Sequence, residues 1–293
     1  MANSLFSIKD IACQYKSNLR PVLQLDSLEI ERGKTYFIVG SSGVGKSTIL
    51  ETLGVMNNTI KVKEGGYIHY HDHESDTAIA IDQLWKQRES VLAKFRKKHL
   101  SFIFQSTNLF GNLTAYQNAS ITPVLKGEKS DDAKLRARQL LAKLYPKEFV
   151  IEIIKGKKVA EMSGGQRQRL AFARALGSDY DVLLADEPTG NLDHHNAHKL
   201  MKILTDIVQR ENRTSVIVSH DIELSATYGD CVVLIAKQEI KEEDGNFKYG
   251  LVTEESVFEK VNENLWRNKG NASEYSSAEI VELLKNAIKD SPN

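Results

Sequence analysis

The sequence predicts an α/β fold with a mixed sheet at its core, an antiparallel β subdomain and an inserted helical subdomain. The first observation is a glycine-rich loop between an apolar run, Tyr36 to Val39, and a helical segment. The second is a set of later apolar runs that each end in polar side chains, as strands do where an open α/β sheet binds ligands. The third is a stretch of helical periodicity between these two parts.

The glycine-rich loop fits the phosphate-loop pattern of a glycine, four residues and then Gly-Lys-Ser. Glycines let the backbone approach an anion closely, and the helix that follows turns its positive dipole end toward that anion. We expect Lys46 to hold the β- and γ-phosphates of a nucleotide and Ser47 to ligate Mg²⁺, which predicts a P-loop NTPase core. The nucleotide-binding residues assigned here are Gly40, Ser41, Ser42, Gly43, Val44, Gly45, Lys46, Ser47 and Thr48.

Composition excludes several classes of protein. Lys plus Arg equals Asp plus Glu at 39 each, so bulk charge gives no reason to expect direct nucleic-acid binding. The two cysteines, Cys13 and Cys231, lie far apart in apolar stretches, which favours small core residues over a disulfide. The start of the chain has no secretory pattern, and no apolar run approaches the length of about 20 residues that spans a bilayer. A membrane role would therefore need another polypeptide.

The N-terminal part has short apolar runs between residues 5 and 30, broken by turns, which predict the strands of the β subdomain. Tyr15 lies among them. It is either an aromatic platform for a base or a half-exposed strand tyrosine, and its position alone leaves both interpretations open. Three histidines at every second residue, His69, His71 and His73, favour a solvated strand face over a metal site, because no fourth ligand is spaced to close one.

Polar side chains follow three later apolar runs. Gln105 ends one run, the pair Asp186 and Glu187 ends the second, and His220 follows the third. Because strands of an open α/β sheet present their carboxyl ends at one edge, we expect these groups at the same edge as the phosphate loop. Asp186 would hold Mg²⁺, and Glu187 would orient and deprotonate an attacking water. A lone histidine after a strand is usually structural, but here it is the third polar group delivered in this way, which favours function.

Between Thr107 and about Lys158 the apolar spacing becomes helical, with a helix start at Ser130 and a stop at Pro146. This predicts the inserted helical subdomain. The core resumes at Ser163-Gly164-Gly165-Gln166, directly ahead of a further helical run. Free amide groups at that helix start form a second candidate anion site.

In this order the motifs resemble those of ABC-type ATPases, over about residues 4 to 236. The Ser-Gly-Gly-Gln signature between Gln105 and the strand of Asp186 is the diagnostic part, since phosphate loops alone occur in many NTPases. Met162 stands where the family usually has leucine, a mild change of similar volume. The fragments after Gln105 and the segment Thr189-Gly190-Asn191-Leu192-Asp193 look like the lipoprotein-release, macrolide-efflux and cell-division branch, whose ATPases work with permeases.

The resemblance implies roles within one subunit. Tyr15 would stack on the adenine of ATP, and His220 would contact the γ-phosphate. Gln105 would link the nucleotide state to the helical subdomain and belong with Ser47 and Asp186 to the Mg²⁺ site. Together with Lys46, the residues Glu187, His220 and Gln105 form the catalytic set.

Further roles lie between subunits of a head-to-tail homodimer. The resemblance implies that Ser163, Gly164 and Gly165, with Gln166 beside them, contact the γ-phosphate bound by the other subunit. Asp193 would bridge the dimer. Because one copy of each motif is present, two composite sites require two copies of the chain.

The leading interpretation is an ATP-hydrolysing subunit that powers a membrane transporter or mechanotransmission complex. Its partners would be integral-membrane permease subunits, which would hold it at the cytoplasmic face of the membrane. The alternative is a soluble ABC-type ATPase of DNA repair, chromosome structure or translation. Against it, the sequence has no long coiled-coil heptads, no clustered zinc cysteines and no tandem second cassette. A regulatory partner that binds ATP without turning it over is a third possibility, which the intact Glu187 disfavours.

The expected domain organisation has four parts. Residues 1–104 hold the β subdomain and the first part of the core, and residues 105–165 hold the helical subdomain with the signature. Residues 166–236 complete the core, and residues 237–293 form a C-terminal extension of unknown role. Within that extension, Ser276 to Glu279 resembles a capping box ahead of an amphipathic helix.

Overall fold

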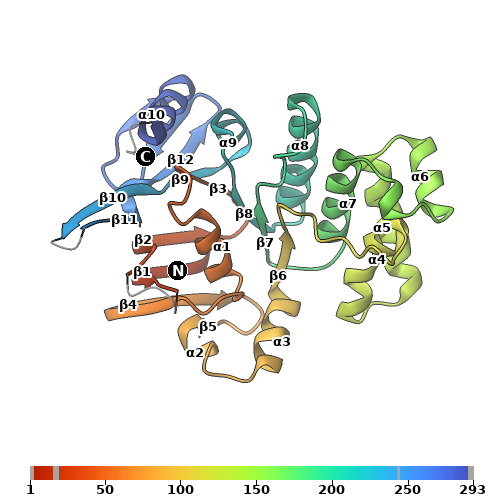
Figure 1. Cartoon of the computed structure of the whole chain (residues 1–293), viewed down its shortest axis with the longest axis horizontal. Helices are drawn as coiled ribbons and strands as arrows, with labels where there is room; N and C mark the ends of the chain where they lie inside the picture. The colour runs from red at the N-terminus through yellow and green to blue at the C-terminus, as the bar shows by residue number, and fades with distance from the viewer. Residues whose placement is uncertain (1–2, 16–19, 243–244, 290–293) are drawn as a thin grey trace. The chain divides into compact units, whose positions relative to one another are not determined.

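The computed structural model describes residues 3–15, 20–242 and 245–289 of the 293-residue chain. The chain divides into two compact units, unit 1 (Met1–Lys94 and Thr214–Asn293) and unit 2 (Phe95–Arg213). The division falls within helix α3 (Glu89–His99), and Figure 1 gives the labels used below. Among the described residues, no helix is both long enough and apolar enough to cross a membrane.

The first sheet of unit 1 has the strand order β10-β11-β2-β1-β4-β5. Its neighbours are antiparallel, apart from the parallel pair of β11 and β2. This sheet is the β subdomain that the N-terminal runs predicted, and the C-terminal segment adds two strands to it. The bounds are β1 (Ser4–Cys13), β2 (Leu23–Glu31), β4 (Ile60–Asp72), β5 (Thr77–Ala80), β10 (Ala236–Glu242) and β11 (Gly245–Val252), with the short helix α2 (Ile81–Leu84) after β5.

The second sheet of unit 1 is mixed, with the order β14-β13-β12-β9-β3-β8 within this unit. Strand β3 pairs in parallel with β8 and β9, and all five of its residues are buried, which accounts for its unbroken apolar sequence. The strands β12 to β14 continue the sheet in antiparallel pairs. The bounds are β3 (Thr35–Val39), β8 (Thr214–Val218), β9 (Cys231–Leu234), β12 (Val257–Asn262), β13 (Leu265–Asn268) and β14 (Glu274–Ser276).

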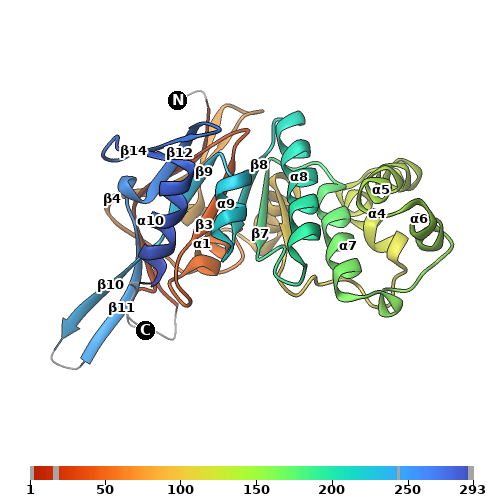
Figure 2. The same cartoon turned by 90° about the horizontal axis from the view of Figure 1, so that it is seen from above.

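The helices of unit 1 include α1 (Lys46–Leu53), α9 (Ile222–Tyr228) and α10 (Ser277–Lys289). The predicted capping box opens α10, since Glu279 N–H donates to Ser276 Oγ and Ser276 N–H donates to Glu279 Oε2. Helix α10 lies beside α9 in both views, and Lys285 Nζ is 2.7 Å from Glu223 Oε1. The C-terminal segment is therefore built into unit 1, and Figure 2 shows its β10–β11 hairpin as a projecting ribbon.

Unit 2 combines a parallel strand pair, β6 (Leu100–Ile103) and β7 (Val182–Asp186), with helices. The helix predicted from Ser130 is α5 (Ser130–Leu144), which packs on its neighbours by the buried positions Ala137, Leu141 and Leu144. Helices α4 to α6 form the helical insertion, and α7, which follows it in the chain, packs beside α4 and α5. The other bounds are α4 (Ala115–Lys126), α6 (Lys147–Ile154), α7 (Gly164–Leu176) and α8 (His194–Arg210).

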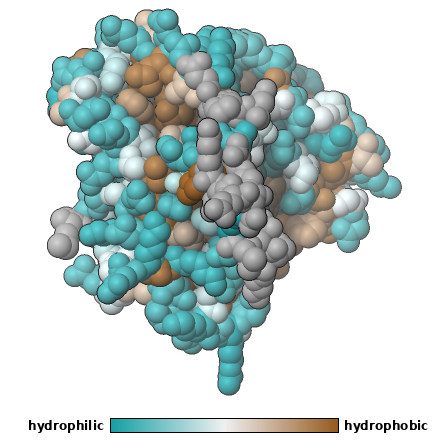
Figure 3. All heavy atoms as spheres, turned by 60° about the vertical axis from the view of Figure 1, so that its left-hand side comes forward, coloured by the Kyte–Doolittle hydropathy of each residue, from teal (hydrophilic) through white to brown (hydrophobic). Residues whose placement is uncertain are grey.

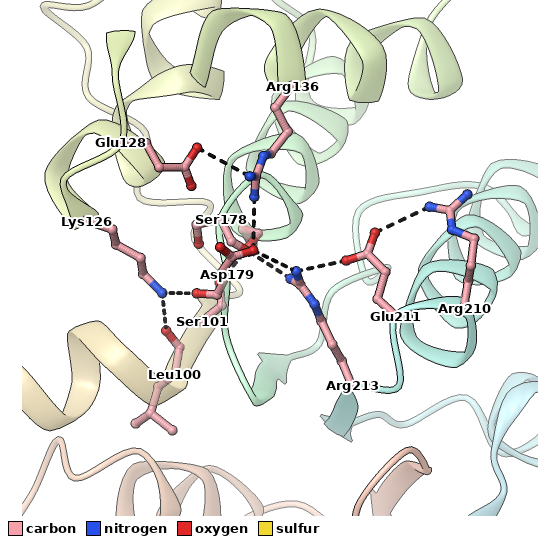
Figure 4. Close-up of polar contacts among 11 residues, drawn as sticks. Leu100, Ser101, Lys126, Glu128, Arg136, Ser178, Asp179, Arg210, Glu211 and Arg213 are labelled. Atoms are coloured by element: carbon pink, nitrogen blue, oxygen red, sulfur yellow. Dashed lines mark hydrogen bonds and ion pairs between the residues drawn. The ribbon is translucent and has the colours of Figure 1, made fainter. Parts of the chain in front are cut away.

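A polar cluster around Asp179 fastens the helices of unit 2 to the strand pair (Figure 4). Arg136 of α5 and Arg213 both donate to Asp179 Oδ1 at 3.1 Å. Lys126, at the end of α4, donates to the carbonyl oxygens of Asp179 and Leu100, and burial lowers its pKa to about 8. The beginning of β6 is thus fixed to α4, while its other end leads to Gln105.

Figure 3 shows a mostly hydrophilic face on which hydrophobic residues gather in separate patches. The exposed hydrophobic side chains of the unit 1 strands include Val62, Ile240 and Val261. Both cysteines are buried and free, as their apolar surroundings predicted.

Candidate functional site

The phosphate loop connects β3 to α1 in unit 1. Gly43 and Gly45 have φ values of 75° and 100°, in the left-handed region that other residues rarely adopt. A Cβ atom on Gly43 would meet nothing within 4 Å, so the loop is uncovered at this residue. Gly45 is the N-cap of α1 and makes no side-chain cap, so the positive end of the helix dipole faces the loop. This cradle fits the phosphates of a nucleotide.

Lys46 and Ser47 begin α1. The Lys46 side chain is only 7% exposed and runs along the loop, where Nζ donates to the carbonyl oxygens of Gly40 at 2.9 Å and Ser41 at 2.8 Å. It thus places a positive charge against the cradle that the loop amides form. Ser47 is exposed, so its hydroxyl is accessible to a bound cation.

Tyr15 is anchored to the same helix. Its hydroxyl lies 3.1 Å from Thr48 Oγ1 and donates to Glu51 Oε2 at 3.0 Å. The ring is half-buried, and burial raises the pKa of its phenol. These contacts hold Tyr15 at the first turns of α1, the helix that follows the phosphate loop.

His220 leaves the sheet next to the phosphate loop. Because β3 and β8 are parallel, with Ile38 opposite Val218, the residues that follow these strands meet at one edge. The exposed His220 precedes α9, which is capped by Asp221 through a 2.8 Å hydrogen bond from Leu224 N–H. A hollow of about 480 Å³ lies beside it, lined by His220, Asp221, Ile222, Glu223, Lys285, Ile288 and Lys289. The C-terminal helix therefore reaches the histidine loop.

Unit 2 brings Gln105, Asp186 and Glu187 to one sheet edge. Ile103 of β6 is opposite Ala185 of β7, so the exposed Gln105 and the two half-buried carboxylates leave parallel strands side by side. Glu187 has a φ of 47°, a conformation that costs free energy in a residue other than glycine. Such strain is typical of functional positions. The carboxylate and amide oxygens at this edge are donors that Mg²⁺ accepts.

The signature opens α7 in unit 2. Gln166 N–H donates to Ser163 Oγ at 3.3 Å and Ser163 N–H donates to Gln166 Oε1 at 2.8 Å, which forms a capping box. Gly164 is exposed, and nothing lies within 4 Å of the place where its Cβ would be. The helix start is thus uncovered around Gly164, while the Gln166 amide is bound within the capping box.

Asp193 lies on a loop beside the signature. A Cβ on Gly165 would be 3.1 Å from Leu192 Cδ2, and Gln168 of α7 donates to the Pro188 carbonyl at 2.5 Å. Asp193 caps α8, and the hydrogen bonds from Asn196 lower the pKa of its exposed carboxyl. The signature and the segment that follows Glu187 therefore form one packed surface.

Sequence reasoning missed one residue of the site, Gly250 on β11. A Cβ there would lie 2.1 Å from the carbonyl oxygen of Val44 and 2.7 Å from Ile235 Cγ2, so the strand backbone rests directly on the phosphate loop. Gly250 N–H donates to the Val22 carbonyl at 3.0 Å, which fixes this approach. A glycine inside a strand is the only signal that the sequence offers for such a contact.

Replacing Gly250 with alanine is expected to lower both the melting temperature and the affinity for ATP. The added methyl group must displace the Val44 carbonyl or β11, and overpacking of this kind costs about 1–3 kcal/mol. Thermal unfolding and nucleotide titration measure the two effects. Gly111→Ala is the control, because nothing lies within 4 Å of its Cβ position. Wild-type melting and affinity in Gly250→Ala would show that the contact is unimportant.

Comparison with known proteins gives one consistent result. The sequence profile of the family described as "ABC transporter" matches residues 23–190. The macrolide export ATP-binding/permease protein MacB of Shewanella oneidensis is 34% identical over 267 residues, covering 91% of this chain and 37% of MacB. The ABC transporter ATP-binding protein YbbA of Escherichia coli K12, described as uncharacterized, is 34% identical over 215 residues, covering 72% of this chain and 85% of YbbA. The chain thus spans little more than a third of MacB.

The fold is that of solved ATP-binding cassettes. A dimeric structure of MJ0796, a bacterial ABC transporter cassette, is 28% identical with a TM-score of 0.66, over 78% of this chain and 94% of MJ0796. A second MJ0796 dimer, in a post-hydrolysis state bound to ADP and phosphate, has a TM-score of 0.64. The predicted fold class, a P-loop NTPase core with a β subdomain and a helical insertion, is confirmed.

Proposed function

Because the chain belongs to the ABC transporter family, we propose that it is the ATP-binding and ATP-hydrolysing subunit of a membrane transporter or mechanotransmission complex. The observation that carries this proposal is the complete set of motifs, each at the end of a strand or the start of a helix within its own unit. Unit 1 offers an open phosphate loop with a buried lysine, and unit 2 offers Glu187 and Gln105 at one strand edge.

The residues of unit 1 bind the nucleotide in this proposal. The α1 amide groups and Lys46 hold the phosphates, and Tyr15 stacks on adenine from its anchored position. His220 contacts the γ-phosphate. Ser47 of unit 1 and Asp186 and Gln105 of unit 2 would supply the oxygen ligands of a Mg²⁺ ion, which would neutralise charge on the phosphates.

The residues of unit 2 carry the hydrolysis step. Glu187 orients a water molecule and takes its proton as the water attacks the γ-phosphorus in line with the bond to the β-phosphate oxygen. ADP and phosphate leave. Gln105 reports the state of the γ-phosphate to the helical insertion. The backbone of Glu187, held in an unusual conformation, fixes its carboxylate for this role.

The active form is a head-to-tail homodimer in this proposal. Ser163, Gly164 and Gly165, backed by Gln166, contact the γ-phosphate held by the second copy, and Asp193 bridges the two copies. The open start of α7 and the dimeric cassettes of similar fold support this arrangement. Each ATP is then sandwiched between two chains, so that hydrolysis separates them.

The partners are permease subunits, and the chain lies at the cytoplasmic face of the membrane through them. The names of MacB and YbbA support a transporter role over a soluble ATPase of DNA repair, chromosome structure or translation. The described part of the chain has no helix of its own that could cross a bilayer.

A pull-down tests the transporter role. Tagged Glu187→Gln protein, with ATP and Mg²⁺, is expected to recover a multi-span membrane protein from detergent-solubilised source membranes, because trapped ATP holds the dimer in its permease-bound state. The same variant without nucleotide is the control. Recovery of ribosomes or nucleic acid without a membrane protein would contradict the transporter role and favour the soluble-ATPase alternative.

A further inference from the structure

Arg174 lies near the C-terminal end of α7, and the nucleotide-binding scheme above gives it no role. Its side chain is 9% exposed, which is unusual for an arginine. In the described part of the chain no carboxylate pairs with it. Burial lowers the pKa of its guanidinium, which reflects the cost of placing this charge inside unit 2.

The guanidinium donates hydrogen bonds to the backbone that follows Gln105. Nη1 donates to the Asn108 carbonyl at 2.6 Å and Nη2 donates to the Thr107 carbonyl at 2.9 Å. The ring of Phe110 lies 6.0 Å from the guanidinium carbon and covers it. One planar group thus binds two consecutive carbonyls, a geometry that the single ammonium of a lysine cannot reproduce.

These two carbonyls belong to an unusual turn. Thr107 and Asn108 have φ values of 59° and 45°, so both lie in the left-handed region. Two such residues in sequence cost free energy, and they persist only where surrounding contacts hold them. The buried Asn118 fixes the other end of the turn, because its side chain accepts from Phe110 N–H at 2.8 Å and donates to the Phe110 carbonyl at 3.0 Å. Arg174 and Asn118 together define the path of residues 106–110.

The same helix begins at the signature. Arg174 is eleven residues after Ser163, which places it about 16 Å along the axis of α7. The segment between them is rigid, since Leu170, Ala171 and Phe172 are completely buried. A displacement at one end of α7 is therefore carried to the other.

We propose that Arg174 is a positioning residue that ties the turn after Gln105 to the signature helix, so that the turn and the helix move together when ATP binds. This inference rests on the proposed function, in which Gln105 and Ser163 face γ-phosphates of two different ATP molecules. In this arrangement α7 connects the two composite sites, and the two hydrogen bonds of Arg174 attach the helix to the turn after Gln105.

Arg174→Met tests the inference, because methionine keeps the apolar stem and removes both donors. We expect wild-type ATP affinity, since the phosphate loop lies in unit 1, and a turnover lower by about tenfold, a typical effect of breaking such a connection. Arg174→Lys should restore only part of the turnover. Arg138→Met is the matched control, because Arg138 is an exposed arginine on α5 of the same unit.

Hydrogen exchange distinguishes a lost connection between the turn and the signature helix from a general loss of stability of unit 2. In the Glu187→Gln background, ATP should protect the amides of both 106–113 and 163–168. Adding Arg174→Met should abolish protection of 106–113 and leave that of 163–168, with faster exchange at 106–113 even without ATP. Unchanged exchange at 106–113, or a rise spread evenly over unit 2 with a lower melting temperature, would overturn the proposal. A wild-type protein without ATPase activity would instead overturn the proposed function, and the nucleotide-free exchange would still test the Arg174 contact.

Discussion

Replacing Lys46 with methionine is expected to abolish measurable ATP binding. The Lys46 ammonium is buried at the start of α1 and already lies against the loop, donating to two of its carbonyls. In the nucleotide complex that we propose, the same donors would serve the β- and γ-phosphates, and each charge-assisted hydrogen bond contributes about 1.5–3 kcal/mol. Methionine fills the same volume without charge, so the Kd for ATP should rise by at least about a hundredfold.

Calorimetric titration with a slowly hydrolysed ATP analogue measures this loss. Lys63→Met is the matched control, because Lys63 is an exposed lysine of the same unit, 3.7 Å from Asp26. Its variant should bind as the wild type does. Normal affinity in a folded Lys46→Met protein would contradict the assignment of the phosphate loop.

Replacing Glu187 with glutamine is expected to remove turnover and preserve ATP binding. Glutamine has the shape of glutamate, so the strained backbone at this position need not change, but its amide cannot take a proton from water. Loss of a general base costs about 10²–10⁴ in rate. Because hydrolysis no longer separates the subunits, the ATP-bound dimer should accumulate.

Phosphate release and size-exclusion chromatography with ATP report the two effects. Glu152→Gln is the control, since Glu152 lies on α6 and pairs with Lys157 at 2.8 Å. It should leave turnover unchanged. If Glu187→Gln hydrolyses ATP at the wild-type rate, another group is the base.

Local patterns predicted much of the fold. The helix α5 has the bounds expected from Ser130 and Pro146, the capping box at Ser276 opens α10, and the apolar run at Tyr36 is a buried strand. Each is specified by residues close in sequence, through caps, breakers or periodicity. The edge positions of Gln105 and His220 followed from one further rule, that parallel strands end together.

The contacts that sequence reasoning missed join distant segments. Gly250 rests on Val44, and Arg174 binds the carbonyls of Thr107 and Asn108. In each contact one partner is a backbone carbonyl, which every residue has, so the sequence contains no pattern that predicts the pairing. For the same reason the segment after residue 236 was expected as an extension of unknown role, whereas it supplies strands to both sheets of unit 1.

The central claim is that two copies of this chain share their ATP sites, and mixing two inactive variants tests it most directly. Lys46→Met lacks the phosphate-loop cation. Gly164→Asp keeps room for its side chain, because nothing lies within 4 Å of the Cβ position, but turns a carboxylate toward the partner's γ-phosphate. Each variant alone should be inactive.

In an equal mixture, half of the dimers are mixed, and each mixed dimer has one site with an intact loop from one copy and an intact signature from the other. ATPase activity should therefore return, to at most about a quarter of the wild-type value. If the mixture stays as inactive as its parents while differently tagged chains are shown to pair, the sites are not shared and the account is wrong.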